Sequence, residues 1–199
     1  MKVKIKKEGK VKEFKLISSW EEVTLEKWLQ LIDFETGTKT EEATETIAAL
    51  SDIPKQLVKE LALSDVANIM SKVGEIQSKQ DTKLKRIIEI NDIEYGFHPD
   101  LDSISLGEYA DIEQFIKNGI DKQLPELMAV LYRPVKEKKN DIYIIDAYDG
   151  DIRLRTEEMK QMSAEQVQSA LVFFYNFAKI LSEILPLYLM EKLKEMKTQ

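Results

Sequence analysis

The chain has 199 residues, of which 43% are hydrophobic and 33% are charged, a composition that suits a folded core and a polar surface. Its 29 basic and 36 acidic residues leave a net charge of −7, which argues against direct nucleic-acid binding because phosphate contacts need cationic side chains. The absence of cysteine excludes disulfides, thiolate zinc sites and cysteine nucleophiles. No apolar run approaches the roughly 20 residues of a membrane span, so we expect a soluble intracellular protein without one.

The first half of the chain predicts a hairpin followed by helices. Apolar residues alternate with charged ones over residues 3–17, on either side of a glycine turn. Ser19 and Glu22 have capping-box spacing, so a short helical turn is expected there. Thr24 has the position of an N-cap for a helix whose apolar residues recur at helical spacing. Three further helices are expected, at 40–50, at 54–61 and, capped by Ser64, at 64–76.

The same order of elements begins again near the middle of the chain. Residues 84–97 predict a second hairpin around an Asn-Asp turn. Ser105 and Glu108 have capping-box spacing and open a helix that is expected to bury one apolar face. A further helix over 121–132 is expected to stop at Pro134. The buried face of the capped helix would consist of Leu106, Tyr109, Ile112 and Phe115.

Residues 136–155 are interpreted as an insertion without a counterpart in the first half. A strand at 141–147 and the Asp-Gly turn that follows it predict an inserted hairpin over 141–155. After a short helix, a capping box at Ser163 opens the longest helix of the chain, which is expected to run almost to the C-terminus with a kink at Pro186.

Apolar residues recur at a spacing of 81 residues, as when Leu25 matches Leu106 and Leu50 matches Leu131. This repeat predicts an α+β fold, mainly α-helical with small antiparallel hairpins, in which a hairpin-plus-helices unit is duplicated and a long C-terminal helix follows. We define residues 1–83 as the first unit and residues 84–199 as the second unit, and we expect them to pack as one domain. Residues that match between the units are expected to serve folding.

The sequence predicts no enzyme, and no catalytic, cofactor or metal site is assigned. It lacks the GxGxxG, GxxxxGK[ST], GxSxG and HExxH motifs. The lone histidine, His98, matches Ile17 of the first unit, which favours a structural role over acid–base catalysis. Asp146, Asp149 and Asp151 surround a glycine and suggest a calcium ligand set, but the full calcium-loop pattern is missing, so a hairpin turn is favoured.

Two features are typical of partner binding. Tyr132 and Arg133 belong to residue types that are enriched in binding hot spots, although an arginine here also suits the negative end of a helix. The terminal helix has two adjacent apolar stripes, which predicts that it is either the central helix of the fold or covered by another chain. The stripe residues expected to contact a partner are Phe173, Phe177, Ile180, Ile184 and Leu187.

Several segments resemble proteins from the structural modules of tailed bacteriophages. The resemblance implies a non-enzymatic role in virion assembly, as a tail assembly chaperone, a built-in virion component or packaged cargo. It further implies binding to other phage structural proteins, self-association, and a location in the host cytoplasm during assembly and then in the virion. The segments are 23–28, 50–54, 103–109 (SISLGEY), 127–134 (LMAVLYRP), 158–163 (EMKQMS) and 172–176 (VFFYN).

Two other functions remain open at this point. The negative net charge fits an acidic regulator or inhibitor of a host nucleic-acid enzyme, although the charges of both signs are interspersed. A small enzyme that uses carboxylates in a groove between the two units is the third reading, but no pair of residues stands out for that role.

Overall fold

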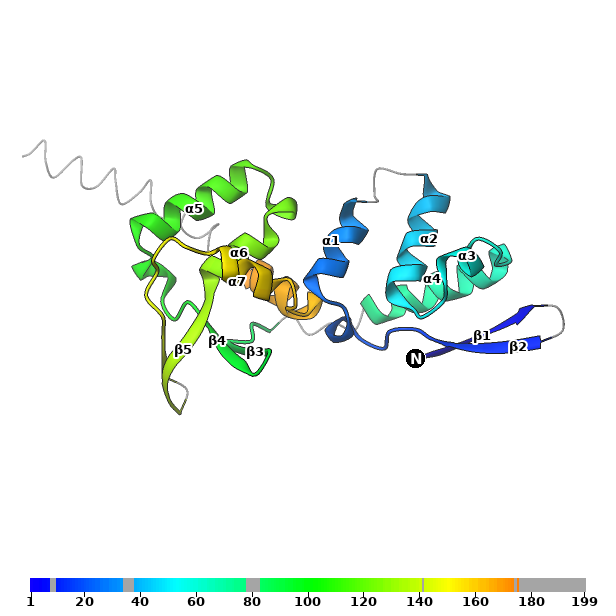
Figure 1. Cartoon of the computed structure of the whole chain (residues 1–199), viewed down its shortest axis with the longest axis horizontal. Helices are drawn as coiled ribbons and strands as arrows, with labels where there is room; N and C mark the ends of the chain where they lie inside the picture. Colours follow the sequence, from blue (N-terminus) through cyan, green and yellow to red (C-terminus); the bar gives the residue numbers. More distant parts are fainter. Residues whose placement is uncertain (8–9, 34–37, 78–82, 141, 174, 176–199) are drawn as a thin grey trace, which may run out of the picture.

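A computed structural model describes residues 1–7, 10–33, 38–77, 83–140, 142–173 and 175. The structure is α+β and mainly helical, and its described residues form two small antiparallel sheets. The molecule is elongated: most of the first unit lies at one end of the long axis and the second unit lies at the other (Figure 1).

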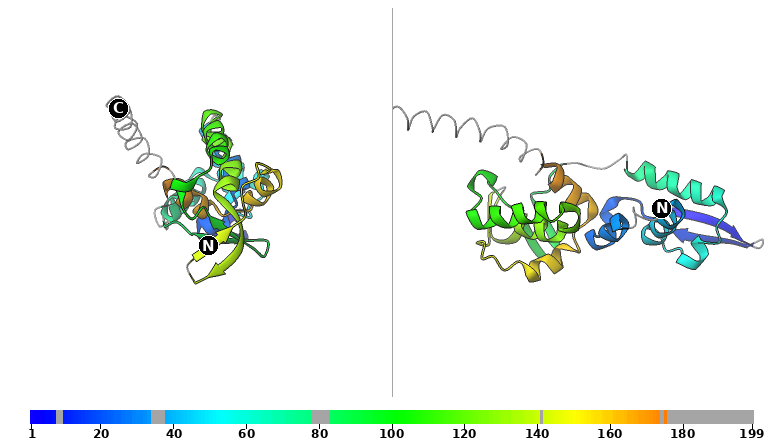
Figure 2. Two further views of the ribbon diagram at one scale, coloured as in Figure 1. Left: turned by 90° about the vertical axis from the view of Figure 1, so that its left-hand side faces the viewer. Right: turned by 90° about the horizontal axis from the view of Figure 1, so that it is seen from above.

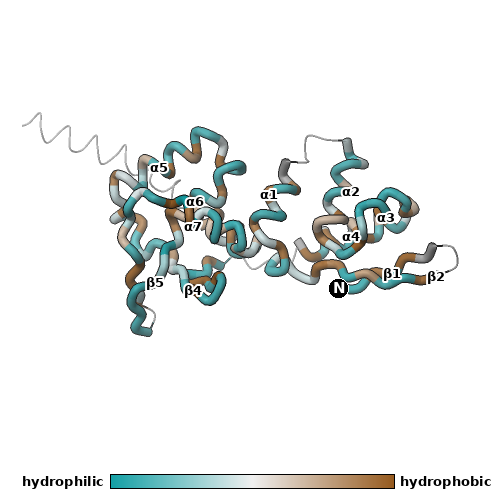
Figure 3. Tube along the Cα trace, viewed as in Figure 1, coloured by the Kyte–Doolittle hydropathy of each residue, from teal (hydrophilic) through white to brown (hydrophobic). Residues whose placement is uncertain are grey.

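The first unit is a hairpin followed by helices. Its two strands pair antiparallel and alternate in hydropathy, with Val3 and Ile5 buried (Figure 3). The hydroxyl of Thr24 accepts a hydrogen bond from the amide of Lys27 (3.3 Å), which confirms the predicted N-cap of the first helix. The elements are β1 (Lys2–Lys7), β2 (Lys10–Lys15), the 3-10 turn η1 (Trp20–Glu22), α1 (Leu25–Asp33), α2 (Lys39–Leu50), α3 (Lys55–Val58) and α4 (Leu63–Gln77).

The second unit combines a four-stranded sheet with helices. The predicted capping boxes at Ser105 and Ser163 are both present, each closed by the side chain three residues later. The sheet order is β3-β4-β5-β6, and residues 164–173 are helical. The elements are β3 (Ile87–Ile90), β4 (Ile93–Phe97), η3 (Leu101–Ser103), α5 (Leu106–Lys117), η4 (Ile120–Lys122), α6 (Leu124–Leu131), β5 (Tyr132–Lys139), β6 (Ile142–Ile145) and α7 (Arg153–Met159).

The duplication extends to individual hydrogen bonds. The amide of Ile17 donates to the carbonyl of Leu50 (3.0 Å), and 81 residues later the amide of His98 donates to the carbonyl of Leu131 (2.7 Å). The isolated bridge between Leu16 and Ser51 likewise corresponds to the pairing of β4 with β5 at Phe97 and Tyr132. The two units therefore share one backbone design up to the start of β5.

Beyond that point the equivalent bonds lie 101 residues apart. The amide of Lys59 donates to the carbonyl of Lys55 (3.3 Å), and the amide of Lys160 donates to the carbonyl of Thr156 (3.3 Å). The segment around α3 and the start of α4 therefore corresponds to the segment around α7 and the helix at 164–173. The change in spacing matches an insertion within the second unit, as predicted over 136–155.

The predicted strand at 141–147 is present as β6, but its hairpin partner is β5, which precedes it, and not a strand after the Asp-Gly turn. α6 ends at Leu131 and β5 begins at the next residue, so Pro134 lies in a strand and does not end a helix. β5 turns at Asn140, which has a φ of 57°, and pairs with β6. Leu154, expected in a returning strand, belongs to α7. The hairpin partner was predicted wrongly because β5 pairs with β4 on one side and with β6 on the other. Local turn signals do not report this tertiary pairing.

The predicted helical turn after Ser19 is present as η1, but its capping interaction differs from the prediction, and so does the start of α4. The capping box at Ser19 does not form, because Glu22 accepts hydrogen bonds from the amide and the hydroxyl of Ser18. These bonds, together with Lys15, lower the pKa of Glu22 to about 2. α4 begins at Leu63, one residue before the predicted cap Ser64. Leu63, the first residue of the helix, is exposed.

Each unit has its own hydrophobic core, and each core includes one buried residue from the other unit. The core of the first unit includes Ala164 from the second unit, and the core of the second unit includes Leu25 from α1. Trp28 packs against both cores. The junction between the units is therefore made by α1 on one side and by the start of the helix at 164–173 on the other.

Gly96 lies in β4 at a position where the neighbouring side chains leave no room for a Cβ. A Cβ at this residue would lie 2.5 Å from the ring of Tyr143 and 2.7 Å from the side chain of Ile145. We expect Gly96→Ala to lower the free energy of unfolding by about 1–3 kcal/mol, because the neighbouring strand must shift. Urea denaturation measures the loss. As a control, Gly74→Ala in α4 has open space around it and is expected to stabilise by about 0.5–1 kcal/mol, so a similar loss in both variants would contradict the packing argument.

Candidate functional site

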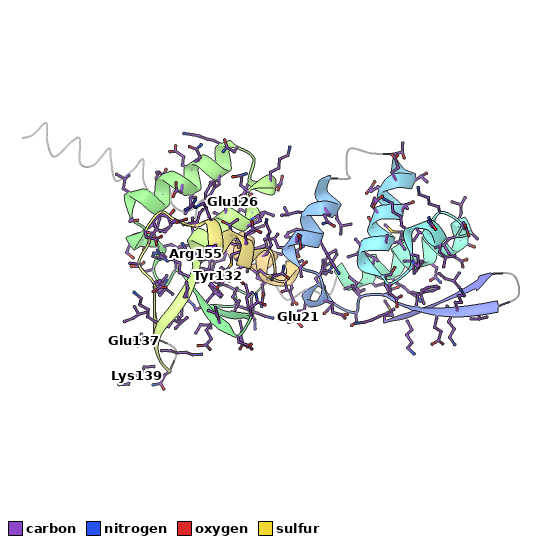
Figure 4. All side chains as sticks on the ribbon, viewed as in Figure 1. Glu21, Glu126, Tyr132, Glu137, Lys139 and Arg155 are labelled. Carbon is purple, nitrogen blue, oxygen red and sulfur yellow. The ribbon has the colours of Figure 1, made fainter. Side chains whose placement is uncertain are left out.

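Tyr132 and Arg133, predicted to contact a partner, lie inside the second unit (Figure 4 for Tyr132). The Tyr132 hydroxyl donates to the carbonyl of Lys85 (2.8 Å), and its ring meets the edge of Phe97 at 5.1 Å between centroids. Both side chains are buried because β5 begins directly after α6 and runs through the middle of the sheet. Their burial speaks against direct contact with a partner.

Phe173 is half-buried and packs edge-on against Phe97, with ring centroids 5.5 Å apart. It therefore contributes to the core of the second unit. Phe177, Ile180, Ile184 and Leu187, and the predicted kink at Pro186, lie outside the described residues. Partner contact through the terminal helix stays a prediction.

A buried charged cluster connects α5 to the sheet. Arg133 Nη1 lies 2.7 Å from Glu108 Oε1, without the alignment of a hydrogen bond, and His98 Nε2 lies 3.5 Å from the same oxygen. The second carboxylate oxygen of Glu108 accepts the amide of Ser105 (2.8 Å). The Arg133 guanidinium stacks over Tyr148 at 5.8 Å. This cluster anchors the first turn of α5 to β4 and β5.

The cluster was not predicted as a unit. Its capping box was recognised, but the counter-charge of Glu108 comes from Arg133 on another element, which local spacing does not reveal. In the first unit the positions equivalent to Glu108 and Arg133 are Lys27 and Asp52, both exposed. The one available signal was that these charged positions differ between two units whose apolar positions match.

The electrostatics keep Glu108 ionised and His98 neutral. Burial raises the pKa of Glu108, but the hydrogen bonds from Ser105 and the charge of Arg133 outweigh it, so the net pKa is lowered. Burial lowers the pKa of His98, and the opposing effect of Glu108 is smaller. The cluster is therefore a carboxylate–guanidinium pair with an uncharged imidazole beside it.

The depressed pKa of His98 predicts a pH dependence of stability. The unfolded chain takes up a proton near pH 6.5, whereas the folded chain resists it. The contribution is fully present above pH 6.5 and is lost as the pH falls from 6.5 through the lower folded pKa. Chemical denaturation well above and well below pH 6.5 should show that His98→Gln flattens this dependence. An unchanged slope in His98→Gln would assign the effect to other groups.

The aspartates around Gly150 make contacts within the chain. The described residues contain no group of three or more His, Asp or Glu side chains that could hold a metal ion. Asp146 pairs with Lys136 (3.0 Å), Asp149 accepts the amide of Asp151 (3.0 Å), and Asp151 pairs with a neighbouring arginine. His98 borders a pocket of only about 140 Å³. The three aspartates thus stabilise the chain segment before α7.

Three exposed apolar residues lie on one side of α5, with the exposed Glu113 among them. We define the α5 face as Leu106, Tyr109 and Ile116, which are 84%, 53% and 47% exposed and lie within one quadrant of the helix. Of the four residues expected in the core, Ile112 and Phe115 face inward as predicted, whereas Leu106 and Tyr109 are exposed. The charged cluster fixes the N-terminal end of this face.

A groove lies at the opposite end of the molecule, between α2, α3 and α4. It encloses about 800 Å³, and we define the α2–α4 groove by four apolar residues and two lysines of its lining, which also includes Glu41 and Glu45. Leu63, at its edge, is 87% exposed. The defining residues are Ile47, Val58, Leu61, Leu63, Lys55 and Lys59.

Comparisons with protein-family models, with curated proteins and with solved structures find no match to this chain. Among the residues that the structure describes, no helix has the length and hydropathy needed to cross a membrane.

Proposed function

We propose that this protein is a non-enzymatic structural or morphogenesis protein of a bacteriophage particle and that it acts by binding other proteins. The observation that carries the proposal is the presence of exposed apolar side chains, in the α5 face and at Leu63 on the edge of the α2–α4 groove, at opposite ends of a duplicated scaffold. Exposed apolar patches of this kind are typical of protein–protein contact sites. The resemblance to phage structural-module proteins assigns the class of partner.

The partners proposed are other phage structural proteins and further copies of this chain. The protein would be found in the host cytoplasm during assembly and in the virion. The acidic-regulator alternative gains no support from the surface, where lysines and glutamates alternate in pairs such as Lys2–Glu13, Lys117–Glu113 and Lys138–Glu94. Such pairing disperses the negative field that a nucleic-acid mimic needs.

The test uses the full chain, tagged and expressed during infection. Affinity purification and mass spectrometry of purified particles should find the protein in the virion or bound to a virion protein. Leu106→Glu, which puts a charge on the α5 face, should reduce this binding, whereas Gln114→Glu, on another side of α5, should not. Absence of the protein both from particles and from complexes with virion proteins would refute the proposal.

A further inference from the structure

The two units contact each other through a helix of the first unit. α1 lies beside the segment that joins α7 to the helix at 164–173 (Figures 1 and 2). The amide of Leu25 donates to the carbonyl of Met162 (2.7 Å), and the amide of Ala164 donates to the carbonyl of Val23 (2.7 Å). Leu25 and Ala164 are both fully buried at this junction. Through this contact the second unit binds the N-terminal end of α1 of the first unit.

The duplication provides a second copy of both partners in this contact. At a spacing of 81 residues, Leu25 corresponds to Leu106, the first residue of α5. At a spacing of 101 residues, the segment 160–167 corresponds to 59–66, which lines the α2–α4 groove. Leu106 is 84% exposed and Leu63 is 87% exposed, although their equivalents at the junction are fully buried. Within the part of the chain that the structure describes, both the α5 face and the α2–α4 groove are therefore uncovered.

We propose that the α5 face of one chain docks into the α2–α4 groove of a second copy of the chain and repeats the contact that α1 makes within the molecule. This inference rests on the protein–protein binding proposed above and names the partner. By equivalence, the amide of Leu106 donates to the carbonyl of Leu61 in the next chain, and the amide of Leu63 in that chain donates to the carbonyl of Ile104.

The two amides needed for these bonds have no acceptor within their own helices. Leu106 and Leu63 are the first residues of α5 and α4, and the amides of a helix's first turn have no acceptor within the helix. At the internal junction, Leu25 and Ala164 are likewise first residues of helices, and their amides are satisfied by the other unit. The same pair of hydrogen bonds, formed between two chains, would satisfy the amides of Leu106 and Leu63.

The proposed contact is head-to-tail. Its two surfaces are different, and they lie at opposite ends of the long axis (Figures 1 and 2). Each added copy therefore leaves one α5 face and one α2–α4 groove free. Contacts of this type continue into an open filament, or close into a ring when the rotation between copies allows it.

The test is the mass of the full chain in solution, measured by sedimentation from low micromolar to near-millimolar concentration. Wild-type protein should grow beyond a dimer as concentration rises. Leu106→Glu and Leu63→Glu should each remain monomeric, but their equimolar mixture should form a one-to-one pair, because each supplies the surface that the other has lost. The matched exposed variants Gln114→Glu and Asn68→Glu should assemble like wild type.

Engineered cysteines test the register, because the chain has none of its own. Within the molecule the amide of Glu26 donates to the carbonyl of Lys160 (3.0 Å), and the equivalent residues are Gly107 and Lys59. A chain with both Gly107→Cys and Lys59→Cys should form disulfide-linked multimers under mild oxidation. Gly107→Cys combined with Asn68→Cys should form far fewer.

The two proposals fail in different ways. A wild-type chain that stays monomeric at all concentrations, or a variant mixture that does not pair, overturns head-to-tail docking even when the protein binds another virion protein. A chain that assembles as described but is absent from particles and from complexes with virion proteins overturns the phage role alone. Circular dichroism melting of Leu106→Glu and Leu63→Glu confirms that a loss of assembly is not a loss of folding.

Discussion

Replacing Arg133 with leucine is expected to lower the free energy of unfolding by about 3–5 kcal/mol, because the change leaves the Glu108 carboxylate buried without its counter-charge. The two charged atoms lie 2.7 Å apart, and both side chains are almost completely buried. Desolvation already raises the pKa of Glu108, and Arg133 is among the groups that reverse the effect. Urea denaturation at neutral pH measures the loss.

Two controls separate the buried charge from a general effect of removing a cation. Lys117→Leu removes the cation of an exposed pair with Glu113 on the same helix and should change stability by no more than about 0.5 kcal/mol. Arg133→Leu combined with Glu108→Gln should regain part of the loss, because the uncompensated charge is gone. A double variant that is less stable than Arg133→Leu would contradict this account.

The second large effect is expected at the junction between the units. Leu25→Ala should lower the free energy of unfolding by about 2–5 kcal/mol, because Leu25 is fully buried in the core of the second unit. Leu106→Ala, at the equivalent position of α5, should change it by no more than about 0.5 kcal/mol, because this leucine is 84% exposed. Denaturation of both variants at a low concentration, where chains are monomeric, measures the difference. Equal losses would mean that the two leucines share one structural role.

Local sequence signals predicted much of the helical framework. Thr24, Ser105 and Ser163 were recognised as caps because an N-cap interaction involves residues only two or three positions apart. The repeat was recognised because equivalent positions need the same apolar residues for the same packing.

The strand pairing of the second unit and the buried cluster could not be predicted in the same way. For the segment that forms β5, the sequence predicts the end of a helix that stops at Pro134, followed by an insertion from residue 136. This segment becomes a strand because β4 and β6 provide hydrogen-bonding partners on either side. Glu108 and Arg133 meet only when α5 and β5 are packed together.

The apolar spacing and the capping residues were sufficient to establish a duplicated α+β chain, because both depend on neighbours within a few positions and on a pattern repeated along the chain. Which leucine of a matched pair is buried was set only when the units packed together. Leu25 is buried because it packs against the second unit. Leu106 holds the equivalent position in the sequence but is exposed at the start of α5. Burial depends on contacts between distant segments, so the exposed surfaces from which a function is argued belong to the tertiary structure.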